Sequence, residues 1–174
     1  MSDIKVIEAS WSQHSKLLSA IRREVFIREQ NVPELLEWDG IDAECQHVLA
    51  IKMTQNVLLD DAANVVRYNY PEIDLGLDKN NQDKDLYQFV IGVGRLASDG
   101  QIGRMAISKN YRRQGIGNQI LHQLIHLAKG RGQSYVYLHA QCYAVAFYQQ
   151  AGFHTIGNRF MDAGIEHIKM EKQW

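Results

Sequence analysis

The sequence is short of cysteine, of net charge and of long apolar runs, and each shortage argues against a class of protein. Cys45 and Cys142 are the only cysteines among 174 residues, so a secreted fold built on several disulfides is not expected. The 19 basic and 20 acidic residues give a formal net charge of −1. General nucleic-acid binders normally carry a basic excess, so no nucleic-acid partner is expected. No run approaches a membrane span and the N-terminus has no apolar signal core, so we expect a cytoplasmic protein with no membrane partner.

What the chain does contain is enough apolar sequence for one globular domain over residues 1–174. Hydrophobic residues make up 45% of the chain, which is typical of a folded core. Strands are expected at 5–9, 47–53, 87–97, 101–107, 135–140, 153–157 and 166–171, and helices at about 12–26, 118–129 and 144–150. This order predicts an α/β (mixed α+β) fold with a central mixed, largely antiparallel sheet flanked by helices. Residues 54–86, rich in Asp and Asn, are expected to form an insertion or long connection.

A glycine-containing basic stretch stands between a predicted strand and a predicted helix. It reads Arg112-Arg113-Gln114-Gly115-Ile116-Gly117. Glycines allow a ligand to approach the backbone closely, and the first N–H groups of a helix lack internal partners. Together with the helix dipole and two arginines, this order predicts a site for an anion such as a phosphate.

Two other patterns have to be weighed before a function is inferred. The stretch Gly92-Val93-Gly94-Arg95-Leu96-Ala97 fits a dinucleotide-binding pattern as text, but the hairpin signal Asp99-Gly100 follows where a helix would be needed. We therefore expect a strand with a bulge or close packing there. Cys45 and His47 have no second ligand pair at zinc spacing, so no metal site is expected.

Residues 34–46 are acidic and predicted to be irregular. Glu37, Asp39 and Asp42 fall in this segment, which contains no Lys or Arg. One interpretation is an acidic wall that attracts a cationic amine substrate. The other is a solvated loop.

Two motifs at a fixed separation resemble the GNAT superfamily of acyl-CoA N-acyltransferases. The first is Arg112-x-x-Gly115-x-Gly117, preceded by Arg104-Met105-Ala106-Ile107 and followed by an amphipathic helix. The second is Ala146-Phe147-Tyr148-Gln149-Gln150-Ala151-Gly152-Phe153. The resemblance covers roughly residue 5 to the end, and its specific part is 104–153.

The resemblance implies acetyl-CoA or a related acyl-CoA as donor, an amine as acceptor and no metal. The pyrophosphate would lie on the backbone of Arg113, Gln114, Gly115, Ile116 and Gly117, beside Arg112 and Phe147. The pantetheine arm would run along the strand that contains Met105, Ala106 and Ile107. A backbone N–H of that strand could hold the thioester oxygen when it becomes an oxyanion. The resemblance also allows a homodimer, although no interface can be read from one sequence.

The implied chemistry is direct transfer to a neutral amine, with a proton donor for the departing thiolate. By resemblance Tyr148 is that acid. The base is left open: Glu29 is preferred, Glu37, Asp39 and Asp42 are alternatives, and His47 and His139 are weaker ones. The family often has an Asn where this chain has Gln141-Cys142-Tyr143.

A second resemblance concerns the N-terminal third. Arg22-Arg23-Glu24-Val25-Phe26 followed by Trp38-Asp39-x-x-Asp42 resembles acyl-homoserine-lactone synthases, which share the fold. Those enzymes usually lack the glycine loop because their donor is a carrier protein, so the CoA-dependent interpretation is favoured. A non-catalytic acyl-CoA-binding regulatory module is the alternative from another class of function.

Overall fold

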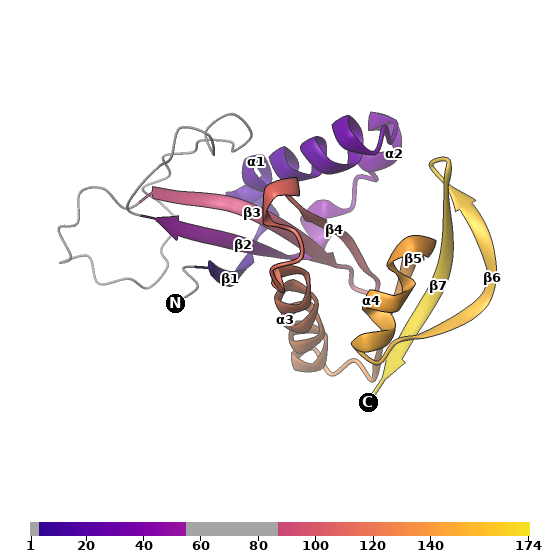
Figure 1. Cartoon of the computed structure of the whole chain (residues 1–174). Coiled ribbons are helices and arrows are strands. Elements are labelled where there is room, and N and C mark those ends of the chain that lie inside the picture. The colour runs from indigo at the N-terminus through magenta and orange to yellow at the C-terminus, as the bar shows by residue number, and fades with distance from the viewer. Residues whose placement is uncertain (1–3, 55–86) are drawn as a thin grey trace.

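Two antiparallel sheets form the framework of the computed structural model, which describes residues 4–54 and 87–174 (Figure 1). The larger sheet has the strand order β1-β2-β3-β4 and the smaller one the order β5-β7-β6. The strands are β1 (Ile4–Ala9), β2 (Gln46–Thr54), β3 (Tyr87–Leu96), β4 (Ile102–Ile107), β5 (Tyr135–Gln141), β6 (His154–Asp162) and β7 (Ile165–Gln173). Each predicted strand is confirmed, although β6 runs further toward its turn than expected. The connection expected at about 54–86 lies outside the described residues.

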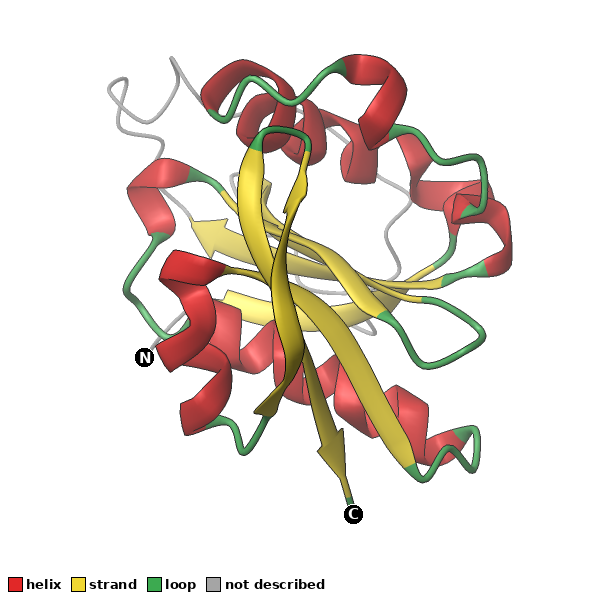
Figure 2. Cartoon of the chain, turned by 90° about the vertical axis from the view of Figure 1, so that its right-hand side faces the viewer, coloured by secondary structure: helices red, strands yellow, loops and turns green. Residues whose placement is uncertain are grey.

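Helices cover both faces of the larger sheet, as Figure 2 shows. Alternate residues of a strand face opposite sides, so Val48 and Ala50 pack in one apolar cluster while Leu49 and Ile51 pack in the other. The first cluster is completed by α3 (Ile116–Gly130) and the second by α1 (Trp11–Arg22). Within the described residues, no helix is both long and apolar enough to cross a lipid bilayer.

Several short helical segments extend or connect these helices and strands. They are the π-helical turns η1 (Arg23–Glu29), which continue α1, then α2 (Glu34–Glu37), η2 (Asp42–Glu44), η4 (Lys109–Tyr111), η5 (Cys142–Ala144) and α4 (Val145–Gln150). The prediction that 34–46 is irregular is therefore wrong in part. The segment α2 is a single turn, which is too short for helical periodicity to show in the sequence.

Glycines in β3 allow α3 to pack close to the sheet. A Cβ on Gly94 would lie 2.7 Å from Ile120 Cγ2 and 2.8 Å from Leu124 Cδ1, and one on Gly92 would lie 2.9 Å from Ile120 Cδ1. These separations leave no room for a methyl group. The dinucleotide-like text in this strand is therefore a packing feature, as predicted.

The two sheets separate where β4 meets β5. An isolated parallel bridge between Gln101 and Tyr137 joins them, so the mixed character predicted for the sheet is confined to that bridge. In β4, Arg104 and Met105 together face the single residue Gly94, and Arg104 has a φ of 51°. Such a bulge bends a strand and interrupts its pairing. It lies where the sheets diverge, and a cleft opens beside it.

Candidate active-site cleft

The glycine stretch forms a tight turn that ends on the first residue of α3. Gly115 precedes the helix with a φ of 80°, and Arg113 has a φ of 60°. No side chain of residues 4–54 or 87–174 caps this end of α3. The first backbone N–H groups of the helix are therefore free of a side-chain partner, which is the arrangement that binds anions.

Arg112 holds this turn against the end of η1. Its guanidinium donates to both carboxylate oxygens of Glu29 at 2.6 Å and, through Nε, to the Ile107 carbonyl at 2.9 Å. The hydrogen bonds from Arg112 lower the pKa of Glu29 below its ordinary value, which makes this carboxylate a weaker base. The geometry therefore weighs against the expected role of Glu29 in deprotonating an amine.

The remaining predicted donor-site residues lie around the same turn. Gln114 is exposed and donates to the Asn110 carbonyl at 3.2 Å, and Ile116 is buried. A Cβ on Gly117 would lie 3.3 Å from Phe147 Cζ and 3.4 Å from Ile107 Cδ1. Phe147 of α4 is thus placed against the turn, as the resemblance implies.

A cleft of about 250 Å³ opens between β4 on one side and β5, α4 and the β6–β7 hairpin on the other. Met105 and Arg104 line it from β4, and Tyr148 lines it from α4. Ala106 faces the opposite side of the strand and is buried in the α1 cluster, so its side chain does not line this cleft.

Tyr148 is held by three neighbours on the cleft wall. Its ring makes edge contacts with Phe147 and Phe153, with centroids 4.9 and 5.9 Å apart, and its hydroxyl lies 3.9 Å from Met105 Sδ. Burial raises the pKa of Tyr148 to about 12. The phenol therefore keeps its proton at neutral pH and is available as a donor to an atom in the cleft.

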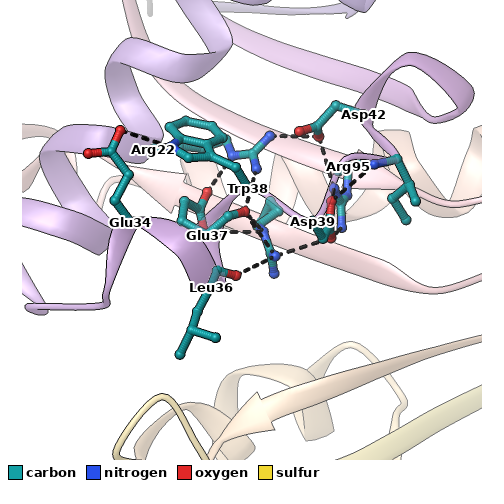
Figure 3. Close-up of polar contacts among 10 residues, drawn as sticks. Arg22, Glu34, Leu36, Glu37, Trp38, Asp39, Asp42 and Arg95 are labelled. Atoms are coloured by element: carbon teal, nitrogen blue, oxygen red, sulfur yellow. Dashed lines mark hydrogen bonds and ion pairs between the residues drawn. The ribbon is translucent and has the colours of Figure 1, made fainter.

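Three carboxylates of the acidic segment, Glu37, Asp39 and Asp42, pair with arginines from other parts of the chain (Figure 3). Arg22 Nε binds Glu37 Oε1 at 2.5 Å and its Nη1 binds Asp42 Oδ1 at 2.7 Å. Arg95 Nη2 donates to Asp39 Oδ2 at 2.6 Å, and its Nη1 donates to Asp39 Oδ1 at 2.8 Å and to Asp42 Oδ1 at 2.9 Å.

Arg104 completes this arginine–carboxylate cluster from β4. Its Nε lies 3.1 Å from Glu37 Oε2 and its Nη2 lies 3.2 Å from Asp39 Oδ2. Each of the three carboxylates thus has at least two arginine contacts. The arrangement weighs against an acidic wall built from Glu37, Asp39 and Asp42, because the three arginines neutralise these three carboxylates.

Carboxylate pKa values in the cluster follow burial and pairing. Hydrogen bonds from Arg95 lower the pKa of Asp39 to about 2. For Asp42, burial raises the pKa, but the bonds from Arg22 and Arg95 outweigh it and the net shift is downward. Burial dominates at Glu37 and raises its pKa despite Arg22 and Arg104. The weaker base candidate His47 is also enclosed, with Nε2 2.8 Å from the Asp42 carbonyl.

Sequence reasoning did not single out several other cleft residues. Gln141 donates to Gln30 at 3.0 Å, Gln30 donates to the Tyr143 hydroxyl at 3.4 Å, and that hydroxyl donates back to Gln141. This ring of bonds links the end of η1 to η5. The cleft is also lined by Asp162 and His167 of the hairpin. Among the described side chains, no three His, Cys, Asp or Glu residues gather closely enough to hold a metal ion.

Comparisons with known proteins agree with this architecture. Residues 58–174 match the acetyltransferase (GNAT) domain family. YyaT of Bacillus subtilis, an uncharacterized protein, is 31% identical over 98% of this chain and 95% of its own. The uncharacterized N-acetyltransferase YjcF of the same organism is 29% identical over 97% and 99%.

Solved structures share the fold at lower identity. An acyl-CoA N-acyltransferase of Pseudomonas aeruginosa superposes with a TM-score of 0.68 at 22% identity, covering 97% of this chain and 99% of that one. A GNAT acetyltransferase of Elizabethkingia anophelis with acetyl-CoA bound superposes with a TM-score of 0.58 at 15% identity, covering all of both chains. The family match and the curated relatives carry the conclusion that this chain belongs to the GNAT acetyltransferase family.

Proposed function

We propose that the chain transfers an acetyl group from acetyl-CoA to a primary amine. One observation carries the proposal: α4 links the two halves of the site through adjacent residues. Phe147 packs on Gly117 at the anion-binding turn, while the Tyr148 hydroxyl reaches Met105 in the cleft. A single molecule with a phosphate at one end and a thioester at the other would span both. The acetyl-CoA bound by the Elizabethkingia protein is such a molecule.

The donor would use backbone groups more than side-chain charge. Arg112 is neutralised by Glu29, so the pyrophosphate would rest on the amides that follow Gly115, with Arg113 exposed nearby. The pantetheine amides would pair with the edge of β4 on the side where the sheets diverge, as an added strand does. The bulge at Arg104 and Met105 interrupts strand pairing next to the cleft. A main-chain N–H freed there would stabilise the thioester oxygen as it becomes negative.

The chemistry then balances with Tyr148 as the acid. The amine nitrogen attacks the acetyl carbonyl carbon, a C–N bond forms, and the C–S bond breaks to release the thiolate. Tyr148 donates its proton to sulfur and regains one from the nitrogen of the intermediate, by way of solvent. The pKa of Tyr148 is raised to about 12, whereas that of an ordinary thiol is about 8.5, so the phenol is the weaker acid of the two. Its hydroxyl therefore first donates a hydrogen bond to the developing thiolate, and full transfer of the proton to sulfur follows.

The first prediction separates donor binding from backbone strain. Gly115→Ala forces an L-residue into a φ of 80° at the anion-binding turn, whereas Gly132→Ala does the same at a φ of 77° beyond the other end of α3. Each change costs about 1 kcal/mol of stability. Only Gly115→Ala also distorts the amides that would meet the pyrophosphate. We expect its acetyl-CoA dissociation constant to rise about tenfold, an effect equivalent to one good hydrogen bond.

Calorimetric titration of both variants with acetyl-CoA measures this difference. Equal losses of affinity in the two variants would show that strain alone matters, and would remove the assignment of the turn to the donor. Donor binding without acetyl transfer to any amine would favour the regulatory-module alternative. An acyl donor used only when carried on a protein would favour the homoserine-lactone-synthase-like alternative.

A further inference from the structure

One wall of the cleft carries two histidines and a carboxylate from the smaller sheet. His139 lies on β5, Asp162 on β6 and His167 on β7, and all three line the cleft. Gln141 pairs with His167, and Asp162 pairs with Ile165. Since alternate residues of a strand share a face, the three side chains lie on the same face of the smaller sheet. We call them the hairpin wall.

Asp162 is the carboxylate of this cleft that is not paired with a cation in the described part of the chain. The other charged groups that line the cleft, Glu37 and Arg104, form an ion pair with each other at 3.1 Å. The field of Asp162 acts on His139, where it opposes the lowering of the pKa by burial. Among the residues that line the cleft, Asp162 is therefore the unpaired negative charge, and it lies at the hairpin wall. Lys169 shares the face of His139, but its ammonium lies over the Tyr137 ring at 4.6 Å.

His167 presents a fixed lone pair in the same place. The side chain is only 8% exposed, and its Nδ1 lies 2.8 Å from the Ile165 carbonyl oxygen. A carbonyl only accepts, so Nδ1 carries the hydrogen and Nε2 carries the lone pair. The ring stacks on Phe160 at 5.9 Å. Within the described residues, no donor makes a hydrogen bond to Nε2, so that lone pair is not already engaged.

We propose that the hairpin wall is the acceptor site, with Asp162 binding the substrate ammonium and His167 acting as the catalytic base. This inference rests on the proposed acetyl transfer. The ammonium passes one proton to His167 Nε2, which becomes an imidazolium, and the neutral nitrogen attacks the thioester. The imidazolium later releases that proton to solvent. The second nitrogen proton replaces the one that Tyr148 gives to sulfur, so one proton is released per turnover.

The surroundings also define the class of amine. The wall opposite the hairpin is apolar where Phe26, Val32 and Leu36 line it. At the mouth, Leu36 is 54% exposed. An apolar wall inside a cleft can hold the hydrocarbon part of a small molecule. A single surplus charge with an apolar mouth suits a monoamine that carries an aromatic or aliphatic group, rather than a polyamine.

The experiment compares amines and variants by thiol release from acetyl-CoA. Wild-type protein should use 2-phenylethylamine and hexylamine with a kcat/KM at least about tenfold above that for spermidine. The single unpaired carboxylate can pair with only one of the several ammonium groups of spermidine. Asp162→Asn should raise the KM for 2-phenylethylamine about tenfold with little change in kcat. Glu166→Gln is the matched control, because Glu166 lies on the other face of the hairpin and pairs with Arg159. It should behave as wild type.

His167→Asn tests the base without removing its structural bond. The Asn amide nitrogen can still donate to the Ile165 carbonyl, as Nδ1 does, but no lone pair replaces Nε2. We expect kcat/KM to fall about 100-fold, the lower end of general-base contributions. The pH profile should change as well. The activity of the variant should depend more steeply on pH than that of the wild type, because without a base only the neutral fraction of the amine reacts. The groups that face His167 are His139, Asp162 and Lys169 on the smaller sheet, with the Glu37–Arg104 pair across the cleft.

The outcomes separate the two levels of the argument. Acetyl transfer that is unaffected by Asp162→Asn and by His167→Asn would overturn the hairpin wall as the acceptor site and leave the proposed function standing. Faster turnover of spermidine than of monoamines would overturn the substrate class. Bound acetyl-CoA with no transfer to any amine would overturn the proposed function itself, and the hairpin wall with it.

Discussion

Replacing Tyr148 with phenylalanine should lower kcat and kcat/KM together by about 100-fold. A general acid raises the rate by roughly 10²–10⁴-fold, and the lower end is expected because the raised pKa of this phenol matches that of a thiol poorly. Phenylalanine keeps the edge contacts with Phe147 and Phe153 and loses only the hydroxyl near Met105. Stability and the affinity for acetyl-CoA should therefore change little. Steady-state kinetics and calorimetry on the same preparation measure both expectations.

Tyr143→Phe is the matched control for this substitution. Tyr143 also lines the cleft, but its hydroxyl is held in the bonds to Gln30 and Gln141. Its loss should cost only a few-fold in rate, since it removes two exposed hydrogen bonds and no proton donor to the thiolate. Because burial raises the pKa of Tyr148 to about 12, deprotonation of Tyr148 should not reduce activity anywhere near neutral pH. Equal rate losses in the two variants would remove the acid role of Tyr148.

Replacing Arg22 with methionine should destabilise the protein by about 3–5 kcal/mol, the cost of removing one partner from a buried ion pair. Arg22 is 1% exposed, lies over the Trp38 ring at 4.7 Å and binds both Glu37 and Asp42. The methionine would leave two buried carboxylates short of a partner. Equilibrium urea unfolding measures the loss. Arg23→Met is the matched control, because the neighbouring Arg23 pairs with Glu34 at the surface and such pairs contribute little.

Acid should act on the same cluster with a defined sign. The pKa of Asp39 is about 2 in the folded chain against an ordinary value of 3.8. This carboxylate stabilises the fold above 3.8, and the contribution is lost as the pH falls from 3.8 through about 2. Asp42 acts in the same direction. The raised pKa of Glu37 acts in the opposite direction, because its ionised form costs stability above that pKa and the cost fades as the pH falls. A wild-type stability that is flat across this acid range would contradict the pairing seen for Asp39.

Features that depend on neighbours in sequence could be predicted. The turn from Arg112 to Gly117, the helix after it and the alternating strands follow from local backbone rules, and the structure confirms each of these elements. The close packing of Gly94 on α3 also agrees with the prediction. Local chemistry was sufficient there because each conclusion involved residues within one or two turns of each other.

Features that depend on long-range pairing could not be predicted. Glu37, Asp39 and Asp42 form an acidic run with no local cation, yet Arg95 and Arg104 reach them from strands more than fifty residues away. Only the folded chain shows that ion pairs with arginines neutralise these carboxylates. The resemblance to homoserine-lactone synthases rested on Arg22, Trp38, Asp39 and Asp42 as a sequence pattern with no physical explanation. The arginine–carboxylate cluster explains why these residues occur together. It fixes α2 and η2 against the larger sheet.

Of the hairpin wall, the sequence indicated only His139, as a weaker base candidate, and Asp162 and His167 were missed for a similar reason. Asp162 stands next to a predicted turn and His167 in a predicted strand, and neither position has chemical meaning until β5, β6 and β7 pair. The register that places Gln141 beside His167 and Ile165 beside Asp162 brings the two side chains to one face. A period-two comparison of the three strands would have shown shared faces, but only with the register known.

The most direct measurement of the central claim is a product assay with acetyl-CoA and 2-phenylethylamine. Free thiol and N-acetylated amine would be quantified in the same reaction by absorbance and mass spectrometry. Acetyl transfer predicts one thiol released for each N-acetyl amine formed, both dependent on the amine. Thiol release with no acetylated amine, across this and other primary amines, would contradict the assignment of the cleft between β4 and β5 as an N-acetyltransferase active site.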